Sequence, residues 1–423
     1  MVPLQHPRKL IVLLAALQAF GPLSIDMYLP GLPQIAADLA SPESSIQLTI
    51  TAFLMGLFIG MLFYGPLSDK YGRRPLLIGG ISLYLLASLG CILASDANQL
   101  VALRFVQALG GAAASVLGRA VVRDLFPINE AARVLSLMHL ITMIATLIAP
   151  LLGGYLLLIF GWRALFVALM IFAGTVLVVT AFKVPETNTG DSRNASVLGA
   201  FAAYFRIVRH PLALGYILCM SFSFAGMFAY ITASPFVYIN YFGVQPQHYA
   251  WLFSLNIGAI ILFVTINART VLKTGPRRML MIGASIAAAS GIALLVTGLQ
   301  GMGGLPAIVA GLFGYVGVTG VLGANSMASL LQHYPQQAGA VAGLAVATQF
   351  GFGALASSLV SALHDGTPLP MTLVVGLAGL LSASALVMAL LSERQSAVAS
   401  LETAGQETGN QAMSGNRTEK CNF

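Results

Sequence analysis

The segment Gly65–Pro75, GPLSDKYGRRP, lies between two long apolar stretches and concentrates several charges in a short distance. Its glycines, Gly65 and Gly72, allow the chain to turn tightly, and Asp69 provides an acid. The segment also has three basic residues, Lys70, Arg73 and Arg74. Loops with such positive charge stay on the cytoplasmic side of a bilayer.

The composition of the whole chain is that of an integral membrane protein. Of 423 residues, 57% are hydrophobic and only 8% are charged, and the mean hydropathy is +0.86. That is too little polar surface to cover a water-soluble globule. The net charge of +7 would suggest nucleic acid as a partner of a soluble protein. In a membrane protein it belongs to the cytoplasmic loops, so no nucleic-acid partner is expected.

Apolar runs of about 20 residues, the length of a membrane-spanning helix, occur twelve times. We therefore predict an all-α integral membrane protein with twelve transmembrane helices and both termini on one side. All but two of the 21 lysine and arginine residues fall in or beside segments on that side, the exceptions being Arg104 and Arg163. Both termini are therefore predicted to be cytoplasmic. The runs are 8–29, 45–65, 75–95, 98–119, 134–157, 164–183, 212–234, 249–268, 278–299, 305–328, 338–362 and 370–391.

The runs divide into two halves. We predict a six-helix bundle over 1–184, a cytoplasmic linker over 185–210, a second six-helix bundle over 211–391 and a disordered tail over 392–423. The linker includes a short amphipathic stretch, VLGAFAAYFRIVRH. The second half has a decayed copy of the opening segment, again between its second and third runs: Arg269, Lys273, Gly275, Pro276, Arg277 and Arg278.

The segment GPLSDKYGRRP resembles the signature loop between the second and third helices of the major facilitator superfamily of transporters. The resemblance implies the major facilitator fold, two pseudo-symmetric six-helix bundles with a substrate cavity at their interface near the midplane. In relatives this loop takes part in a network that closes the cytoplasmic side in the outward-facing state. Arg73 is expected to pair with Asp124, and Asp69 to lie near the start of a helix. The alternative is a charged loop that only sets topology. The predicted cytoplasmic gate is Gly65, Asp69, Gly72, Arg73, Arg74 and Asp124.

Two ionisable residues inside spans are functional candidates, because a charge within the membrane is costly. Asp26 lies near the outer end of the first span, and Arg104 lies about two turns into the fourth. At 1.5 Å per residue their depths differ by roughly 5 Å, so we predict that they share one site. A carboxylate that alternates between protonation and pairing with arginine suits proton-coupled transport. The alternative is that Asp26 caps the first helix before Pro30 and is always ionised.

Three further stretches resemble the bicyclomycin-resistance branch of the drug/proton antiporters, which also includes chloramphenicol exporters. They are SIDMYLPGLP from Ser24, RFVQALGGAAASVLGRAVVRD from Arg104 and SFSFAGMFAYITASPFVYIN from Ser221. The resemblance implies export of a small-molecule drug in exchange for protons, across the inner membrane of a bacterium, with Asp26 and Arg104 in coupling. Ala108 departs from the branch, which usually has glycine after the glutamine at this point.

The stretch Ala149–Gly154 resembles the motif that separates antiporters from uptake members of the superfamily. Pro150 lacks a backbone donor and should kink its helix, while Gly153 and Gly154 allow close packing. Any membrane helix can contain such residues, but beside the other matches this motif favours efflux.

A drug pocket needs apolar area with a few polar groups. The candidate lining residues are Tyr28, Phe53, Met55, Gln107, Phe224, Phe228, Tyr230, Tyr238 and Asn256. The six histidines form no metal-binding pair and no nucleophile motif occurs. We therefore expect no cofactor, no metal and no enzyme activity, and a monomer in the lipid bilayer. A metabolite exporter, a proton symporter on the same fold, a membrane enzyme and a channel remain alternatives.

Overall fold

The computed structural model describes residues 7–188 and 197–419 of the chain. Within these ranges, twelve helices are long and apolar enough to span a membrane, which confirms the predicted all-α membrane protein. Each predicted apolar run overlaps one of them, and only the runs 8–29 and 75–95 extend beyond the helix, by three and two residues. The spanning helices are α1 (Pro7–Asp26), α3 (Glu43–Tyr71), α4 (Arg73–Leu93), α5 (Ala97–Leu125), α6 (Ile128–Phe160), α7 (Arg163–Lys183), α9 (Pro211–Pro235), α10 (Pro246–Thr274), α11 (Pro276–Gln300), α12 (Gly304–His333), α13 (Ala338–Ala362) and α14 (Leu369–Glu419).

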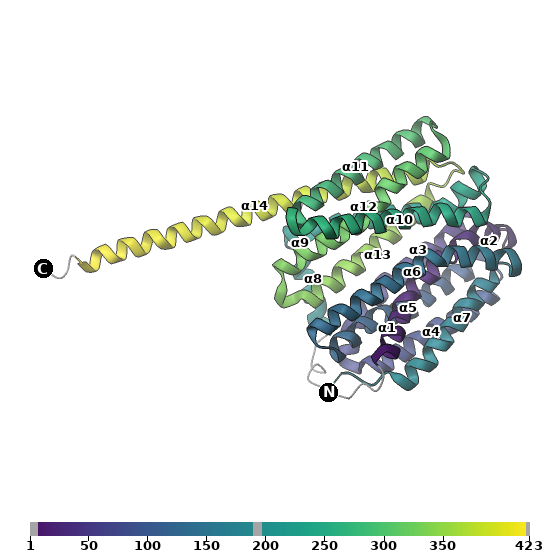
Figure 1. The fold of residues 1–423 in the computed structure, drawn as a ribbon, viewed down its shortest axis with the longest axis horizontal. Helices are drawn as coiled ribbons and strands as arrows, with labels where there is room; N and C mark the ends of the chain where they lie inside the picture. The colour runs from purple at the N-terminus through teal and green to yellow at the C-terminus, as the bar shows by residue number, and fades with distance from the viewer. Residues whose placement is uncertain (1–6, 189–196, 420–423) are drawn as a thin grey trace.

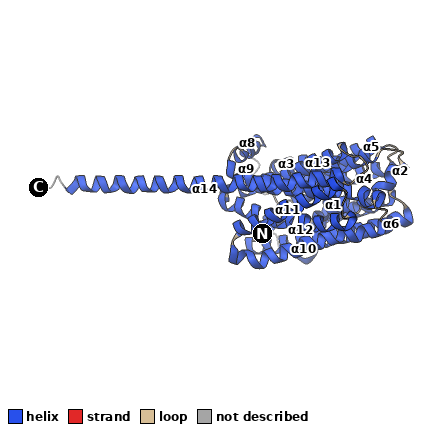
Figure 2. Cartoon of the chain, turned by 90° about the horizontal axis from the view of Figure 1, so that it is seen from above, coloured by secondary structure: helices blue, strands red, loops and turns tan. Residues whose placement is uncertain are grey.

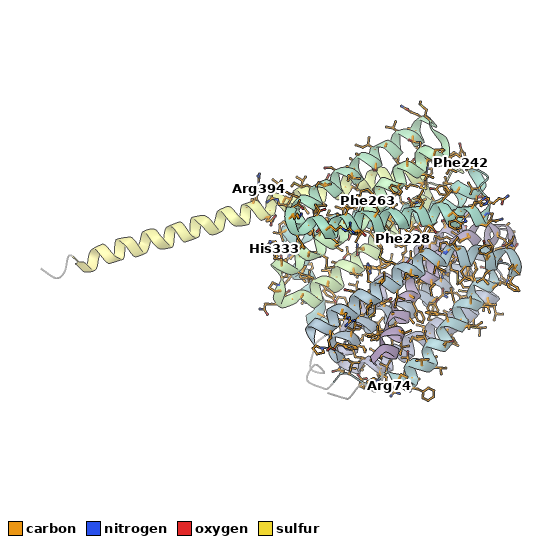
Figure 3. All side chains as sticks on the ribbon, viewed as in Figure 1. Arg74, Phe228, Phe242, Phe263, His333 and Arg394 are labelled. Atoms are coloured by element: carbon orange, nitrogen blue, oxygen red, sulfur yellow. The ribbon has the colours of Figure 1, made fainter. Side chains whose placement is uncertain are left out.

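Figure 1 shows two bundles side by side, α1–α7 and α9–α14, which we call the N-terminal and C-terminal halves. Helix α1 begins and α14 leaves the bundle at the same end, which we call the terminal end. Arg74, His333 and Arg394 also lie there, whereas Phe242 lies at the opposite, distal end (Figure 3). The view in Figure 2 shows the long α14 projecting from the terminal end.

Short elements occur beside the spanning helices. After α1 the chain forms η1 (Leu29–Gly31) and α2 (Leu32–Asp38), each with a proline in its first turn, where the missing N–H has no partner to lose. This ends α1 at Asp26. The π-helix η3 (Phe236–Tyr241) follows α9, η4 (Pro335–Gln337) precedes α13, and α8 (Val197–Val208) forms in the linker.

Glycine allows helices of the N-terminal half to pack with their backbones close together. A Cβ atom at Gly56 on α3 would lie 2.5 Å from the Phe105 carbonyl oxygen and 2.7 Å from the Ala108 Cβ on α5. The close contact of the two helices at Ala108 therefore depends on the glycine of the partner helix. Gly110 on α5 likewise approaches the Gly80 carbonyl oxygen of α4, at 2.5 Å from an added Cβ.

The copy of the opening segment in the second half folds like the first. Gly72 has a φ of 99° between α3 and α4, and Gly275 has a φ of 79° between α10 and α11. Each glycine ends one helix and precedes the next. A positive φ is a conformation that other residues rarely adopt, which explains glycine at both places.

The end of the chain continues the last spanning helix. Helix α14 runs to Glu419, and no proline interrupts the sequence after the last span. The disorder expected from residue 392 stays a prediction. The described part of the linker has no regular secondary structure at 185–188 and is helical at Val197–Val208. The predicted boundaries at 1–6, the centre of the linker at 189–196 and the last tail residues at 420–423 lie outside the described residues.

Candidate functional site

A cavity of about 560 Å³ lies between the two halves. Helices α1 and α6 line it from the N-terminal half, and α9, α10, α12 and α13 line it from the C-terminal half. Its wall is mostly apolar, which suits a lipophilic ligand. The larger apolar side chains are Met143, Phe224, Met227, Phe228, Phe253 and Phe350, and the polar ones are Asp26, His139, Thr142, Thr146, Thr319 and Gln349.

Asp26 is the carboxylate of this cavity. It is the last residue of α1, lines the cavity and is 5% exposed. Its side chain interacts with that of Thr146 on α6. It also lies within electrostatic range of Tyr230 and Tyr249 in the C-terminal half. Asp26 therefore faces the interface between the halves, where its charge interacts with residues of both.

Arg104 lies in a separate, fully buried cluster inside the N-terminal half. Its guanidinium carbon is 4.2 Å from the ring centre of Phe53 and 4.6 Å from that of Tyr28. One terminal nitrogen donates to the Gln107 side-chain oxygen at 2.6 Å, and the other donates to the Ser24 carbonyl oxygen at 2.9 Å. Aromatic faces and carbonyl oxygens thus surround the cation.

The Gln107 side chain extends this cluster to α4. Its amide nitrogen donates to the Ser88 hydroxyl at 2.8 Å, and the Ser88 hydroxyl donates to the Tyr84 carbonyl oxygen at 2.8 Å. The Ser24 hydroxyl donates to the Phe20 carbonyl oxygen and therefore accepts from the Tyr84 hydroxyl, both at 2.5 Å. Helices α1, α4 and α5 are thereby joined by hydrogen bonds around one buried cation.

The structure does not bring Asp26 and Arg104 together as we predicted from the sequence. Among the described residues, no ion pair joins them. Arg104 bonds to the backbone of Ser24, whose side chain contacts Tyr84 on α4 within the same cluster. Asp26 lies two residues further along α1, and side chains two apart on a helix point to different faces. Ser24 therefore faces the Arg104 cluster, whereas Asp26 faces the cavity.

The predicted pocket residues fall into three groups, with Met55 outside all of them. Phe224 and Phe228 line the cavity, and Phe228 is labelled in Figure 3 on the side of the C-terminal half that faces its partner. Tyr28, Phe53 and Gln107 belong instead to the Arg104 cluster. Met55 is partly buried against the core.

The remaining three candidates form a buried tyrosine cluster at the distal end of the C-terminal half. The Asn256 amide donates to the Tyr230 hydroxyl at 2.9 Å. The ring of Tyr238 lies 6.4 Å from that of Tyr230 and 6.0 Å from that of Tyr249, measured between centres. These residues position the C-terminal wall beside Asp26 and are not among the described lining residues of the cavity.

Sequence analysis missed the contribution of α6 to the cavity. His139, Thr142, Met143 and Thr146 all line it. Their spacing of three, four and seven residues places them on one helical face. That spacing, polar residues repeated along one face of an otherwise apolar span, was the signal available in the sequence.

The predicted gate residues lie together at the terminal end. Arg73 pairs with Asp69 at 2.7 Å and with Asp124 at 3.1 Å, and it donates to the Ser68 hydroxyl. Arg74 donates to the Ala181 carbonyl oxygen at 2.7 Å. Gly65 faces open space, since nothing lies within 4 Å of an added Cβ. The contacts described here join α3, α4, α5, α7 and the linker.

Glu186, which we did not predict, is the acid at the start of α4. Its two oxygens accept from the backbone N–H groups of Arg73 and Arg74 at 2.9 and 3.2 Å. Burial raises the pKa of Glu186, but hydrogen bonds from the backbone of Asn188, Arg73, Arg74 and Thr187 outweigh this and hold that pKa below its ordinary value. The carboxylate therefore stays ionised and stabilises the helix start.

The antiporter-like motif packs α6 against both halves. An added Cβ on Gly153 would clash with the Met27 carbonyl oxygen, next to Asp26. An added Cβ on Gly154 would lie 3.8 Å from Gln247 in the C-terminal half. Pro150 is buried within α6, which stays one continuous helix. The motif thus brings α6, with Thr146, close to the end of α1.

A cavity between two six-helix halves, with a buried carboxylate in its wall, is the arrangement of a membrane transporter. Residues 14–358 match the family model described as "Major Facilitator Superfamily". The chain belongs to this superfamily. The match includes the signature segment, its copy and every described lining residue of the cavity.

Named relatives cover much of the chain. The "Bicyclomycin resistance protein homolog" of Haemophilus influenzae is 35% identical over 367 residues, which are 86% of this chain and 92% of the relative. The "Uncharacterized MFS-type transporter YdgK" of Bacillus subtilis is also 35% identical, over 86% of this chain and 90% of its own length. The "Multidrug resistance protein MdtL" of Escherichia coli is 32% identical over 67% of this chain and 71% of its own length.

Solved structures agree on the fold. The crystal structure of a D-xylose–proton symporter matches with a TM-score of 0.68 and 17% identity, covering 89% of this chain and 96% of that one. A partially occluded inward-open structure of the xylose transporter XylE from Escherichia coli matches with a TM-score of 0.67, at the same identity and coverage. These matches confirm the predicted major facilitator fold.

Proposed function

We propose that this protein is a proton-coupled drug exporter that moves bicyclomycin-like antibiotics out of the cytoplasm in exchange for protons. The observation that supports this most is Asp26, the only carboxylate among the described lining residues of an otherwise mainly apolar cavity. The relatives named for bicyclomycin and multidrug resistance support drugs as the ligand class. The packing of the antiporter-like motif next to Asp26 favours export over uptake.

The proposed orientation places the terminal end in the cytoplasm of a bacterium and the distal end outside its inner membrane. It follows from the charges, because all but two of the 21 lysine and arginine residues were assigned to the side of the termini. At the distal end the halves are joined by the Thr51 and Ser357 hydroxyls, 2.8 Å apart, and by further contacts described below. A ligand would enter this conformation from the cytoplasmic side.

Exchange would depend on the two protonation states of Asp26. An ionised carboxylate is costly beside apolar side chains, so it favours either a proton or a polar group of the ligand. Thr146 lies beside the carboxylate and offers it a hydroxyl group. When ligand replaces the proton on the cytoplasmic side, and a proton replaces the ligand outside, each half-cycle moves one of the two. We propose that a monomer is sufficient, since both halves of the cavity belong to one chain.

A second candidate function is export of chloramphenicol-type drugs or of a small metabolite through the same cavity. The wall supports this possibility because it offers aromatic and methionine side chains with few polar groups. Apolar pockets of this kind discriminate weakly between ligands of similar size. Substrate identity must therefore be measured.

The test is drug accumulation in cells that express the wild type, Asp26→Asn or Asp38→Asn, with bicyclomycin and chloramphenicol in parallel. Asp38 accepts a hydrogen bond from the Trp162 ring nitrogen at 2.9 Å and lies outside the described cavity wall, so Asp38→Asn is the matched control. We expect cells with the wild type or Asp38→Asn to accumulate less drug than cells with Asp26→Asn. This difference should disappear when the proton gradient is collapsed. Export by Asp26→Asn at the wild-type rate would refute the coupling role.

A further inference from the structure

A pair of titratable side chains joins the two halves at the distal end. Glu43 begins α3 in the N-terminal half, and His364 follows α13 in the C-terminal half. The imidazole Nε2 atom lies 3.1 Å from the Glu43 carboxylate. The His364 side chain is 20% exposed and the Glu43 side chain 30% exposed, so water reaches both. We call Glu43 and His364 the distal pair.

Other contacts hold the distal pair in place. The Gln47 amide nitrogen, one turn along α3 from Glu43, lies 3.4 Å from the imidazole Nδ1 atom. The Asn240 side chain, from η3 in the C-terminal half, donates to the other oxygen of Glu43. The Phe236 ring lies 6.1 Å from the imidazole, measured between centres. Each polar contact crosses between halves, so each must break when the distal end opens.

The neutral imidazole already fits this arrangement. With its hydrogen on Nε2, it donates to Glu43, and Nδ1 accepts from the Gln47 amide. The Gln47 side-chain oxygen, however, is buried and has no hydrogen-bond partner. A buried acceptor without a partner is unfavourable. The neutral state therefore leaves one group of the interface unsatisfied.

Protonation would add an ion pair to this contact. Nδ1 becomes a donor in the imidazolium, and a half-turn of the Gln47 amide lets its oxygen accept from Nδ1, so the hydrogen bond to Gln47 is kept. The hydrogen bond to Glu43 then joins two opposite charges and becomes stronger. Opening the distal end would separate the imidazolium from both Glu43 and Gln47.

The charged groups around His364 also favour its protonated form. Asp365 adjoins His364 in the loop after α13. Burial raises the pKa of Asp365, but hydrogen bonds with Thr367 and the charge of His364 outweigh this and hold that pKa below its ordinary value. From η3, Tyr241 lines the same small cavity, of about 240 Å³. The charged groups that face His364 are thus the carboxylates Glu43 and Asp365.

We propose that the distal pair is a pH-sensitive latch, which acid on the distal face strengthens so that the two halves stay closed at that end. The structural claim needs no transport activity, and only the assignment of the distal face to the outside rests on the proposed function. In an exporter of that orientation, acid outside would favour closure of the outer mouth. Both protons and latch would then promote return of the carrier to the cytoplasm-facing state.

The test measures opening directly, by pulsed electron spin resonance between labels on the distal loops. Cysteines replace Ser95 in the N-terminal half and Met302 in the C-terminal half, both exposed. The native cysteines are replaced by serine, and Asp26→Asn removes the contribution of that group. Samples in lipid nanodiscs are compared at about pH 5.5 and about pH 8, which bracket the range in which histidine changes charge.

We expect the ratio of short to long distances to rise by about two- to fivefold at the lower pH, the effect of one exposed ion pair. His364→Gln and Glu43→Gln should each abolish this rise. The control is His333→Gln, because His333 pairs with Glu393 at 3.9 Å within the C-terminal half alone, and it should keep the rise. No rise in the parent, or a rise that persists in both His364→Gln and Glu43→Gln, would overturn the proposal. Because Asp26→Asn is present throughout, failure of proton-coupled export would leave this result unaffected.

Discussion

Arg104 shows how a single buried side chain can be essential for packing where the sequence suggests coupling. It contacts Ser24, Gln107 and the rings of Tyr28 and Phe53, and among the described residues it forms no ion pair with Asp26. A guanidinium suits this site because it is planar, donates in two directions and stacks on rings. A lysine has the same charge but cannot reproduce that geometry.

We therefore expect Arg104→Lys to destabilise the protein, by about 1–3 kcal/mol for each buried partner left without a hydrogen bond. The measurement is the apparent melting temperature in detergent, together with drug accumulation in cells. Arg163→Lys is the control, since Arg163 also donates to carbonyl oxygens and stacks on Trp162, but at an exposed position where water can substitute. If Arg104→Lys left the melting temperature unchanged but uncoupled export from protons, Arg104 would have a coupling role and not a packing role.

At the same scale, the sequence predicted that Asp26 would matter but not what it contacts. Apolar runs report depth in the membrane, so Asp26 and Arg104 were correctly placed within two spans. The direction of each side chain around its helix depends on which neighbours pack there, and that was not available. The same holds for the predicted pocket residues. Tyr230 and Phe228 are two residues apart on α9, and of these two only Phe228 is among the described lining residues of the cavity.

Helix α6 is the element that links the cavity wall to its support. One face contributes His139, Thr142 and Thr146 to the cavity, and the Gly153 backbone touches the end of α1 at Met27. The sequence predicted this helix because its apolar run is longer than a membrane requires. It also indicated close packing through the glycine pair, without indicating which helix each glycine approaches.

Exchange of one hydrogen for a methyl group should separate the roles of the two glycines. Gly153→Ala would force α6 away from Met27, because a carbonyl oxygen of the backbone cannot rotate aside. Overpacking of this kind costs about 1–3 kcal/mol, and the shift would also move Thr146 away from Asp26. Gly154→Ala would place its methyl at an ordinary contact distance of 3.8 Å and should be neutral. The measurements are melting temperature and export, and equal behaviour of the two variants would contradict this account.

The whole molecule consists of two halves, and the wall of the cavity between them is formed by residues of both. The spans, their number and the internal repeat could be predicted because they are properties of local sequence. A cavity at the interface was implied by the family resemblance, but most of its lining could not be predicted, since the wall combines residues as distant as Pro22 and Gln349, which only the packing of the halves brings together. The same is true of the contacts at the distal end, where residues on α3 meet residues that follow α9 and α13.

Movement of the halves as units makes a prediction for the contact between Thr51 on α3 and Ser357 on α13. Their hydroxyl oxygens are 2.8 Å apart, so cysteines at both positions should form a disulfide, whose sulfur atoms lie about 2 Å apart. In a background free of native cysteines, oxidation of the double variant should stop drug export, because the distal end can no longer open. Reduction should restore export, while each single cysteine variant should transport equally well under both conditions. If the oxidised, cross-linked protein exported drug at the rate of the reduced form, the halves would not need to separate here, and a rocking movement about the cavity would be excluded.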